Sequence, residues 1–191
     1  QSYRMNTLQN IDETEELWDV FDINRQPTGK THKRGEPFSE GEFHQVIHIC
    51  IFNSKGNLLI QKRQPWKKEW SGMWDLSVAG SAIAGEDPRK AAEREALEEL
   101  GLELDLSNIR PEFTINFDHG FDDYFIIQKD VDIRKLKLQK EEVAAVKWAT
   151  KYEVHNLAAK HQMIPYILFD FIFDAIEHQN LLKKNIEKQE K

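Results

Sequence analysis

The sequence predicts an α+β protein in which strands precede and follow a central helix and pack as a mixed sandwich. Three observations support this prediction. Short apolar runs rich in β-branched and aromatic residues alternate with turn signals. One segment in the middle of the chain has the spacing and the caps of a helix. Strands and helices do not alternate regularly, which favours a mixed sandwich over a doubly wound parallel sheet.

The strands and loops follow from these patterns in chain order. Strands are expected at residues 15–23, 44–52, 58–63, 74–78, 113–117, 124–128 and 144–149. The run at 44–52 is apolar on both faces and should be a buried strand, which a hairpin loop returns to 58–63. Turns or loops are expected at residues 24–29, 34–41, 53–57 and 64–73.

The clearest helix is expected over residues 87–100. Asp87 can cap its N-terminus, and Pro88 suits the first helical position. Gly101 stands where a left-handed residue commonly ends a helix. A second helix is expected over residues 164–178.

Length and composition limit the class of protein. A chain of 191 residues with 40% hydrophobic residues suits one domain, expected over 11–180. Residues 1–10 are expected to be disordered or foreign to the natural chain, and the tail at 181–191 should fray. A net charge of −7 argues against a nucleic-acid polymer as partner, because surfaces that bind such polymers are basic.

Cysteine usage and hydropathy indicate the compartment. Cys50 is the single cysteine, which excludes an internal disulfide and fits a reducing environment. The longest apolar run, residues 164–176, is too short to span a bilayer and contains two aspartates. We therefore expect a cytoplasmic protein without a membrane partner.

Three carboxylates gather on one face of the expected central helix. With Glu95 at the origin of a helical wheel, Glu98 and Glu99 fall on either side of it, within an arc of roughly 100°. Like charges this close repel unless a cation lies among them. A hard divalent cation such as Mg²⁺ suits oxygen ligands of this kind. Glutamates on a helix are more often a solvated face, so the three carboxylates alone do not decide between these interpretations.

The wider pattern around this helix is far more specific. It reads Gly, five residues, Glu, seven residues, Arg-Glu, an apolar residue, any residue, Glu-Glu, any residue, Gly and an apolar residue. The chain supplies these positions as Gly80, Glu86, Arg94, Glu95, Ala96, Glu98, Glu99, Gly101 and Leu102. Seven fixed identities recur by chance at about one in 10⁹ starts. The chain therefore resembles the Nudix hydrolases, whose signature this pattern is.

The resemblance implies a Nudix-like α/β/α sandwich with a mixed β-sheet. It implies hydrolysis of a diphosphate linkage in a small organic diphosphate, including nucleoside diphosphates, with Mg²⁺ or Mn²⁺ as cofactor. Carried over position by position, the metal ligands would be Glu95, Glu98, Glu99 and the backbone carbonyl of Ala79. Glu98 and Arg94 would belong to the catalytic machinery, and Glu86 would support it.

A further acidic residue is expected outside this motif. Members of the family often place a ligand or general base on a loop well after it, and Glu142, six residues before Trp148, resembles that element. Glu141 is the next candidate, followed by Asp122 and Asp123. A general base must also meet geometric requirements that spacing alone does not fix.

Substrate-binding residues are expected where the strand at 58–63 ends. Lys62 and Arg63 stand there and are expected to contact phosphate, and Trp70 in the following loop is expected to stack on the organic group or to cover the pocket. The alternatives are a solvated charged loop and a tryptophan packed in the core.

A looser resemblance connects the chain to isopentenyl-diphosphate isomerase. It rests on segments 17–22, 43–44, 56–63 and 72–74. That enzyme needs a cysteine just before the first glycine of the motif and a metal-binding histidine just after it, where this chain has Ala79 and Ser81. His44 does match a metal-site histidine of the isomerase. Hydrolysis is therefore expected, and an isomerase or a non-catalytic binding module is the alternative. The sequence leaves open whether the chain forms a homodimer.

Overall fold

The computed structural model describes residues 15–189, without the side chains of residues 181–187. The expectation for residues 1–10 therefore lies outside the described residues. In chain order the elements are β1 (Leu17–Phe21), β2 (Pro27–Lys33), β3 (His44–Phe52), β4 (Leu58–Arg63), β5 (Trp74–Asp75), β6 (Val78–Ser81), α1 (Pro88–Leu100), β7 (Phe113–Phe117), β8 (Gly120–Gln128), the 3₁₀ helix η2 (Ile133–Lys135), β9 (Val143–Ala149), α2 (Lys151–Ala159) and α3 (Phe169–Gln189).

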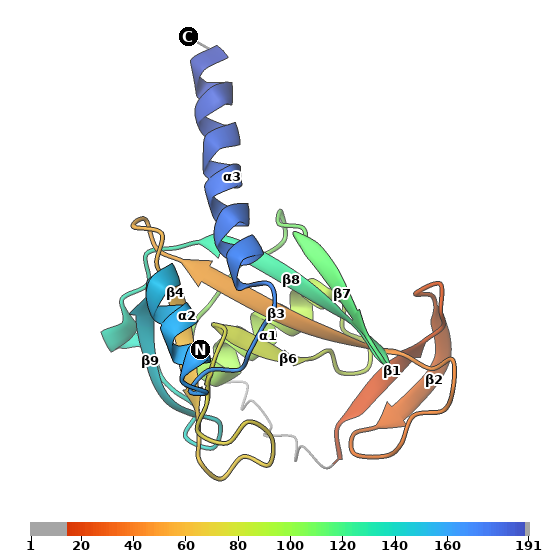
Figure 1. Cartoon of the computed structure of the whole chain (residues 1–191). Coiled ribbons are helices and arrows are strands. Elements are labelled where there is room, and N and C mark those ends of the chain that lie inside the picture. The colour runs from red at the N-terminus through yellow and green to blue at the C-terminus, as the bar shows by residue number, and fades with distance from the viewer. Residues whose placement is uncertain (1–14, 190–191) are drawn as a thin grey trace, which may run out of the picture.

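Seven of the described strands form one sheet, whose main path runs β5-β4-β3-β8-β7 (Figure 1). In addition, β6 pairs with β3 and β9 pairs with β4. The central pair, β3 and β8, is parallel from His44 opposite Gly120 to Phe52 opposite Gln128. The other pairs described for this sheet are antiparallel. The mixed sheet that the sequence predicted is thus confirmed.

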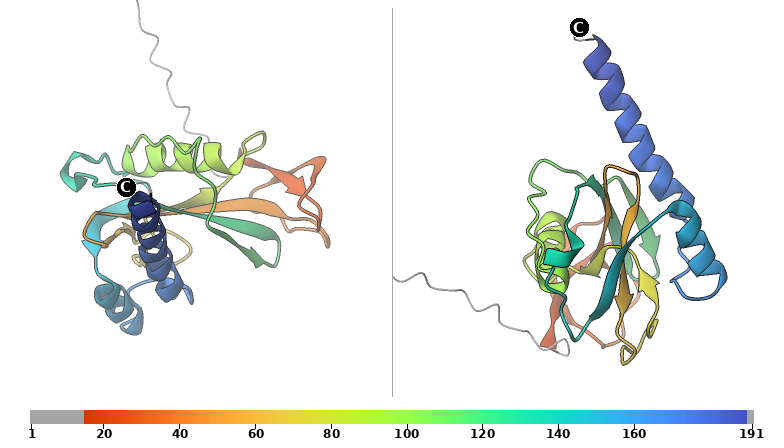
Figure 2. Two further views of the ribbon diagram at one scale, coloured as in Figure 1. Left: turned by 90° about the horizontal axis from the view of Figure 1, so that it is seen from above. Right: turned by 90° about the vertical axis from the view of Figure 1, so that its left-hand side faces the viewer.

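Helices cover both faces of the sheet, which confirms the predicted α+β sandwich. Figure 2 shows α1 on one face, with α2 and the first turns of α3 on the opposite face. Ile47, Ile49 and Ile51 of β3 pack in the core that includes α1, whereas Cys50 and Phe52 pack in the core that includes α2 and α3. Successive side chains of a strand point to opposite faces, so a central strand between two cores carries apolar residues on both faces.

The first strands form a separate hairpin at one end of the sheet (Figure 1). β2 pairs with β1 in antiparallel register from Leu17 opposite Lys33 to Phe21 opposite Pro27. β2 was not predicted from the sequence, because its residues are almost all exposed and lack the apolar alternation of a half-buried strand. Phe21 and Phe43 exchange backbone hydrogen bonds of 2.8 and 3.1 Å, which connect the hairpin to the start of β3.

The predicted strand at 74–78 is two short strands with different neighbours. β5 pairs with β4, and β6 pairs with β3. Ser77 lies between them and is fully buried. Its hydroxyl accepts a hydrogen bond from the backbone N–H of Ile51 and donates one to the carbonyl of Leu59. The chain can therefore cross from one strand to the other without leaving buried polar groups unpaired.

The C-terminal helices differ from the prediction. α2 was missed, because Val154 is its single buried residue and its apolar pattern is weak. α3 begins at Phe169 instead of residue 164, because Ile164 donates a backbone hydrogen bond to Trp74 and precedes Pro165, which disfavours a helical conformation. The helix then continues to Gln189, into the segment expected to fray. Within the described residues, none of the helices has the length and apolar character needed to cross a membrane.

Candidate active site

The helix that carries the acidic motif has the termini that its sequence predicts. Asp87 accepts a hydrogen bond from the backbone N–H of Lys90 at 2.9 Å, and Pro88 is the first helical residue. Gly101 has a left-handed φ of 62°, and its N–H bonds back to the last turn of α1. These caps fix where α1 begins and ends. They therefore help to set the position of its side chains relative to the strands beneath it.

A cavity of about 260 Å³ lies between α1, β6, the end of β4 and the hairpin β1–β2. Its lining is strongly charged, with six glutamates and four cationic side chains. They are Glu16, Glu69, Glu95, Glu98, Glu99, Glu142, Arg34, Arg63, Lys67 and Arg94. Ala79, Gly80 and Ser81 of β6 supply backbone to the same surface. The structure thus brings the metal ligands predicted from the motif to one cavity.

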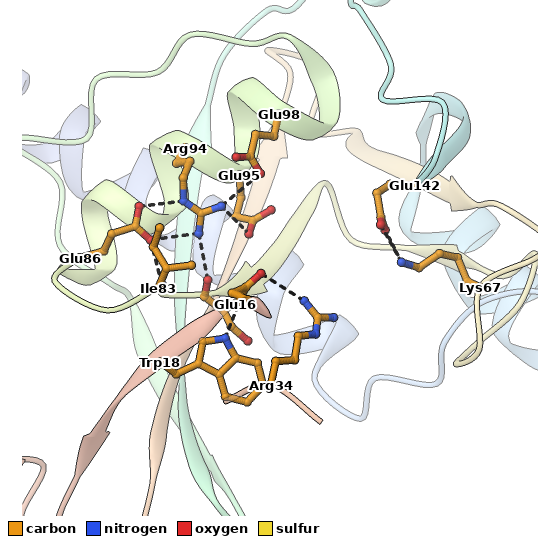
Figure 3. Close-up of polar contacts among 11 residues, drawn as sticks. Glu16, Trp18, Arg34, Lys67, Ile83, Glu86, Arg94, Glu95, Glu98 and Glu142 are labelled. Atoms are coloured by element: carbon orange, nitrogen blue, oxygen red, sulfur yellow. Dashed lines mark hydrogen bonds and ion pairs between the residues drawn. The ribbon is translucent and has the colours of Figure 1, made fainter. Parts of the chain in front are cut away.

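Arg94 is the centre of the hydrogen-bond network on α1 (Figure 3). Its guanidinium forms a bidentate pair with Glu86 at 2.7 and 3.0 Å and donates to the carbonyl of Ser81 at 3.0 Å. It also donates to Glu95 at 3.0 Å and to Glu98 at 3.1 Å. Burial alone would lower the pKa of Arg94, but the hydrogen bonds to Glu86 and the surrounding carboxylates raise it above its ordinary value. Arg94 therefore stays charged and orients these glutamates.

Glu95 packs directly against the backbone of Gly80. A Cβ atom added to that glycine would lie 2.4 Å from Cδ of Glu95 and 2.5 Å from its Oε1. The motif requires glycine at this position because the carboxylate occupies the space of a side chain. Burial raises the pKa of Glu95 to about 8, although the charge of Arg94 opposes this shift.

Glu99 is the most deeply buried of the three motif glutamates, with 9% of its surface exposed. Its carboxylate accepts a hydrogen bond of 2.8 Å from the side-chain amide of Gln61, which also donates to the carbonyl of Ser77 at 3.0 Å. Burial and the nearby charge of Glu95 raise the pKa of Glu99 well above its ordinary value. Gln61 was not predicted from the sequence, although a lone amide after three apolar residues of a buried strand indicates a buried polar contact.

The chemistry of this donor set fits a divalent metal ion. The candidate ligands Glu95, Glu98, Glu99 and the backbone of Ala79 all offer oxygen, the donor that Mg²⁺ and Mn²⁺ prefer. Burial raises the pKa of Glu95 and of Glu99, and the charges of neighbouring glutamates raise them further, so a cation among these carboxylates would favour their ionised forms. In the described part of the chain, however, no three acidic, histidine or cysteine side chains are gathered closely enough to hold an ion. Glu95 and Glu98 turn to Arg94 instead (Figure 3).

Glu142, the predicted base, lines the same cavity from the loop before β9. Its carboxylate accepts hydrogen bonds from Nζ of Lys67, with N–O distances of 2.7 and 2.6 Å (Figure 3). The alternatives Asp122 and Asp123 lie elsewhere, because Asp122 pairs with His48 at 2.7 Å and Asp123 accepts from Thr114. The role of Glu142 as base stays a prediction.

The predicted substrate-binding residues divide into two groups. Arg63 lines the cavity, donates to the carbonyl of Glu69 at 3.1 Å and lies 3.8 Å from Asp75. Lys62 and Trp70 are exposed and lie outside the cavity lining. A side chain of β4 points to the opposite face from its neighbours, so Lys62 turns away from the side that Gln61 and Arg63 share. Contact of these three residues with substrate stays a prediction.

Comparisons with known proteins agree with this geometry. A family profile described as the NUDIX domain matches residues 42–169. An uncharacterised Nudix hydrolase of Listeria monocytogenes is 53% identical over 159 residues, which cover 83% of this chain and 94% of that protein. Isopentenyl-diphosphate Delta-isomerase 2 of Photorhabdus laumondii is 26% identical over 87% of this chain and 96% of its own length. The crystal structure of DR0079 from Deinococcus radiodurans covers 82% of this chain and 97% of its own, with a TM-score of 0.65 at 21% identity, and supports the fold alone.

Proposed function

The chain belongs to the Nudix family, and we propose that it hydrolyses the phosphoanhydride bond of a small organic diphosphate with Mg²⁺ or Mn²⁺ bound in the cavity beside α1. The observation that carries this proposal is the set of buried oxygen donors on α1 and β6. Burial raises the pKa of Glu95 and Glu99 in this set, because it disfavours their ionised forms. A divalent cation and a phosphate chain would complement this set of charges.

The residues around the cavity have different roles in the proposed reaction. Water adds to one phosphorus atom, the bridging P–O bond breaks, and the proton of the water goes to a carboxylate oxygen of Glu142. Arg94 orients Glu95 and Glu98 through its hydrogen bonds. Lys67 fixes the position of Glu142. A divalent cation held by the oxygens of Glu95, Glu98, Glu99 and Ala79 would neutralise the diphosphate and lower the pKa of a bound water.

The alternative of an isopentenyl-diphosphate isomerase is disfavoured by the thiol chemistry of the chain. Cys50, the single cysteine, is fully buried in the core that includes α2 and α3, outside the cavity lining. Burial raises the pKa of its thiol, so it is a poor acid–base group. Ala79 occupies the position at which the isomerase has its cysteine, and it offers the cavity no side chain that transfers protons.

The test measures phosphate release from a panel of organic diphosphates with Mg²⁺, with Mn²⁺ and with excess chelator. We expect turnover with either metal and none with chelator. Glu98→Gln should lower kcat by at least about 100-fold, because it removes the charge of a ligand while keeping its size. Glu93→Gln, the same change on the same helix outside the cavity lining, should leave kcat unchanged. Full turnover in chelator, or a fully active Glu98→Gln, would contradict the proposal.

A further inference from the structure

The side-chain amide of Gln61 connects the sheet to one of the motif glutamates. Its nitrogen donates a hydrogen bond of 2.8 Å to Oε2 of Glu99 and one of 3.0 Å to the backbone carbonyl of Ser77. A carbonyl oxygen can only accept, so the amide atom beside Ser77 must be the nitrogen. Because the same atom contacts Glu99, these two contacts determine the orientation of the amide.

The backbone of Gln61 is fixed on both edges of β4. Gln61 lies opposite Val146 of β9 on one edge and opposite Asp75 of β5 on the other. Its side chain is buried. A side chain on a strand that is paired on both edges has a position set by the sheet, which makes such strands precise supports for functional groups. The amide of Gln61 therefore approaches Glu99 from a rigid part of the fold.

The other acceptor of this amide is fixed as well. Ser77 is fully buried between β5 and β6. Its hydroxyl accepts from the backbone N–H of Ile51 and donates to the carbonyl of Leu59, so it is tied to both β3 and β4. The carbonyl of Ser77 thus occupies one N–H of the Gln61 amide, and the second N–H is directed at Glu99.

The second carboxylate oxygen of Glu99 faces the cavity. Gln61 binds Oε2, and Glu99 is one of the lining residues. In the part of the chain that the structure describes, Nδ1 of His44 is the one buried side-chain nitrogen or oxygen without a hydrogen-bond partner. Oε1 of Glu99 accepts no hydrogen bond from these described residues, so it must be accessible. A ligand in the cavity can therefore reach Oε1 while Gln61 keeps hold of Oε2.

We propose that Gln61 is a positioning residue that holds Glu99 in place to bind the divalent cation. The inference rests on the function proposed above, in which Glu99 is one of the oxygen ligands. Glu95 and Glu98 accept hydrogen bonds from Arg94, so a cation competes with a charged partner for them. Glu99 is held by a neutral amide, which leaves Oε1 for the cation. Groups that orient a metal ligand in this way commonly contribute about 10- to 100-fold to metal affinity.

The test measures Mn²⁺ binding by electron paramagnetic resonance, at a temperature where thermal melting shows each variant to be folded. Gln61→Met keeps the length of the side chain and removes its donors, and it should raise the Kd for Mn²⁺ at least about 10-fold. Gln61→Leu, a second apolar replacement, should do the same.

The matched control is Gln45→Met. Gln45 is also a buried glutamine on a strand, and its amide donates to the carbonyls of Val46 and Phe121, outside the cavity lining. This control should lose stability, because it also removes buried hydrogen bonds. Its Kd for Mn²⁺ should stay within about 2-fold of the parent value, since no contact of Gln45 reaches the metal ligands.

Metal activation of hydrolysis provides a second measurement. With a substrate identified from the panel, Gln61→Met should raise the Mn²⁺ concentration that gives half of the maximal rate at least about 10-fold. The KM for the diphosphate at saturating Mn²⁺ should change by less than about 3-fold, because Gln61 acts through a metal ligand and not on the substrate. A general loss of structure would not separate these two constants.

The outcomes distinguish this inference from the function on which it rests. A parental Kd for Mn²⁺ in Gln61→Met, or equal weakening in Gln45→Met, would overturn the role of Gln61 and leave the proposed function standing. A parent protein that binds no Mn²⁺, or that hydrolyses the panel at full rate in excess chelator, would overturn the proposed function and the role of Gln61 with it.

Discussion

Gly80→Ala tests whether the position of Glu95 controls activity. The added methyl group would lie 2.4 Å from Cδ of Glu95, whereas ordinary contacts begin at 3.4 Å. The carboxylate must therefore retreat by about 1 Å, because the β6 backbone on the other side is paired with β3. The backbone of Gly80 is not left-handed, so alanine meets no conformational penalty there, and the collision with Glu95 is the whole perturbation.

The magnitude follows from the size of this displacement. A misplacement of about 1 Å in a catalytic arrangement lowers the rate by about 100-fold, which corresponds to about 3 kcal/mol of transition-state stabilisation. The free energy of unfolding should change less, near the lower end of the roughly 1–3 kcal/mol typical of overpacking, because the group that moves is the end of a flexible side chain. Gly80→Ala should therefore lose most of its activity and keep most of its stability.

The assay compares kcat for diphosphate hydrolysis with the midpoint of thermal unfolding in the parent and in Gly80→Ala. Glu95→Asp supplies the matched background, because its shorter side chain withdraws the carboxylate from the glycine. In that background Gly80→Ala should have a smaller effect, and the double-mutant cycle should show coupling between the two positions. A Gly80→Ala variant with parental kcat would refute the argument that Glu95 acts from this position.

Further predictions concern Glu142, Tyr166 and His44. Glu142→Gln should lower kcat with little change in KM and flatten the acid limb of the pH–rate profile, and a parental profile would exclude it as base. Tyr166→Phe removes the hydroxyl between Asp75 and His48, so urea denaturation should show a loss of about 1–3 kcal/mol, and unchanged stability would contradict this. Burial, with the charges of His32, Arg34 and His119, lowers the pKa of His44 to about 4. Because this folded pKa lies below the ordinary 6.5, stability is lost as pH falls from 6.5 to about 4, by about 2–3 kcal/mol, and in His44→Phe this loss should disappear.

Local patterns in the sequence were sufficient to predict the central part of the fold and the site. The caps at Asp87 and Gly101 are set by residues within the helix and its ends, so the bounds of α1 could be predicted. Buried β3 could be predicted because the two cores that it separates require apolar residues on both of its faces. The positions of Glu95, Glu98 and Glu99 on one face follow from helical geometry alone. These are the features whose causes lie within a few residues of each other.

The features that were missed depend on contacts between distant segments. The amide of Gln61 meets Glu99 across 38 residues, and Lys67 meets Glu142 across 75. The charges at Glu16 and Arg34 reach the cavity because the hairpin is fixed to the loop that carries Gly85. No local period or propensity encodes such pairings, since they arise only when the sheet has brought the segments together. Lys62 is a further example. Its position in the sequence predicted that it lies near the site, but its side chain is exposed on the other face of β4.

The position of Arg94 explains how the chain can hold several carboxylates close together beside α1. Unpaired buried charges would be strongly unfavourable, and Arg94 offsets part of this cost by contacting Glu86, Glu95 and Glu98 together. Glu99 accepts a hydrogen bond from the neutral amide of Gln61, and burial keeps its pKa well above the ordinary value. In the proposed function, a divalent cation would compete with Arg94 for Glu95 and Glu98 and would gain Glu99 as a further ligand. If the proposal holds, replacing Arg94 would therefore change both the affinity for the metal ion and the stability of the fold.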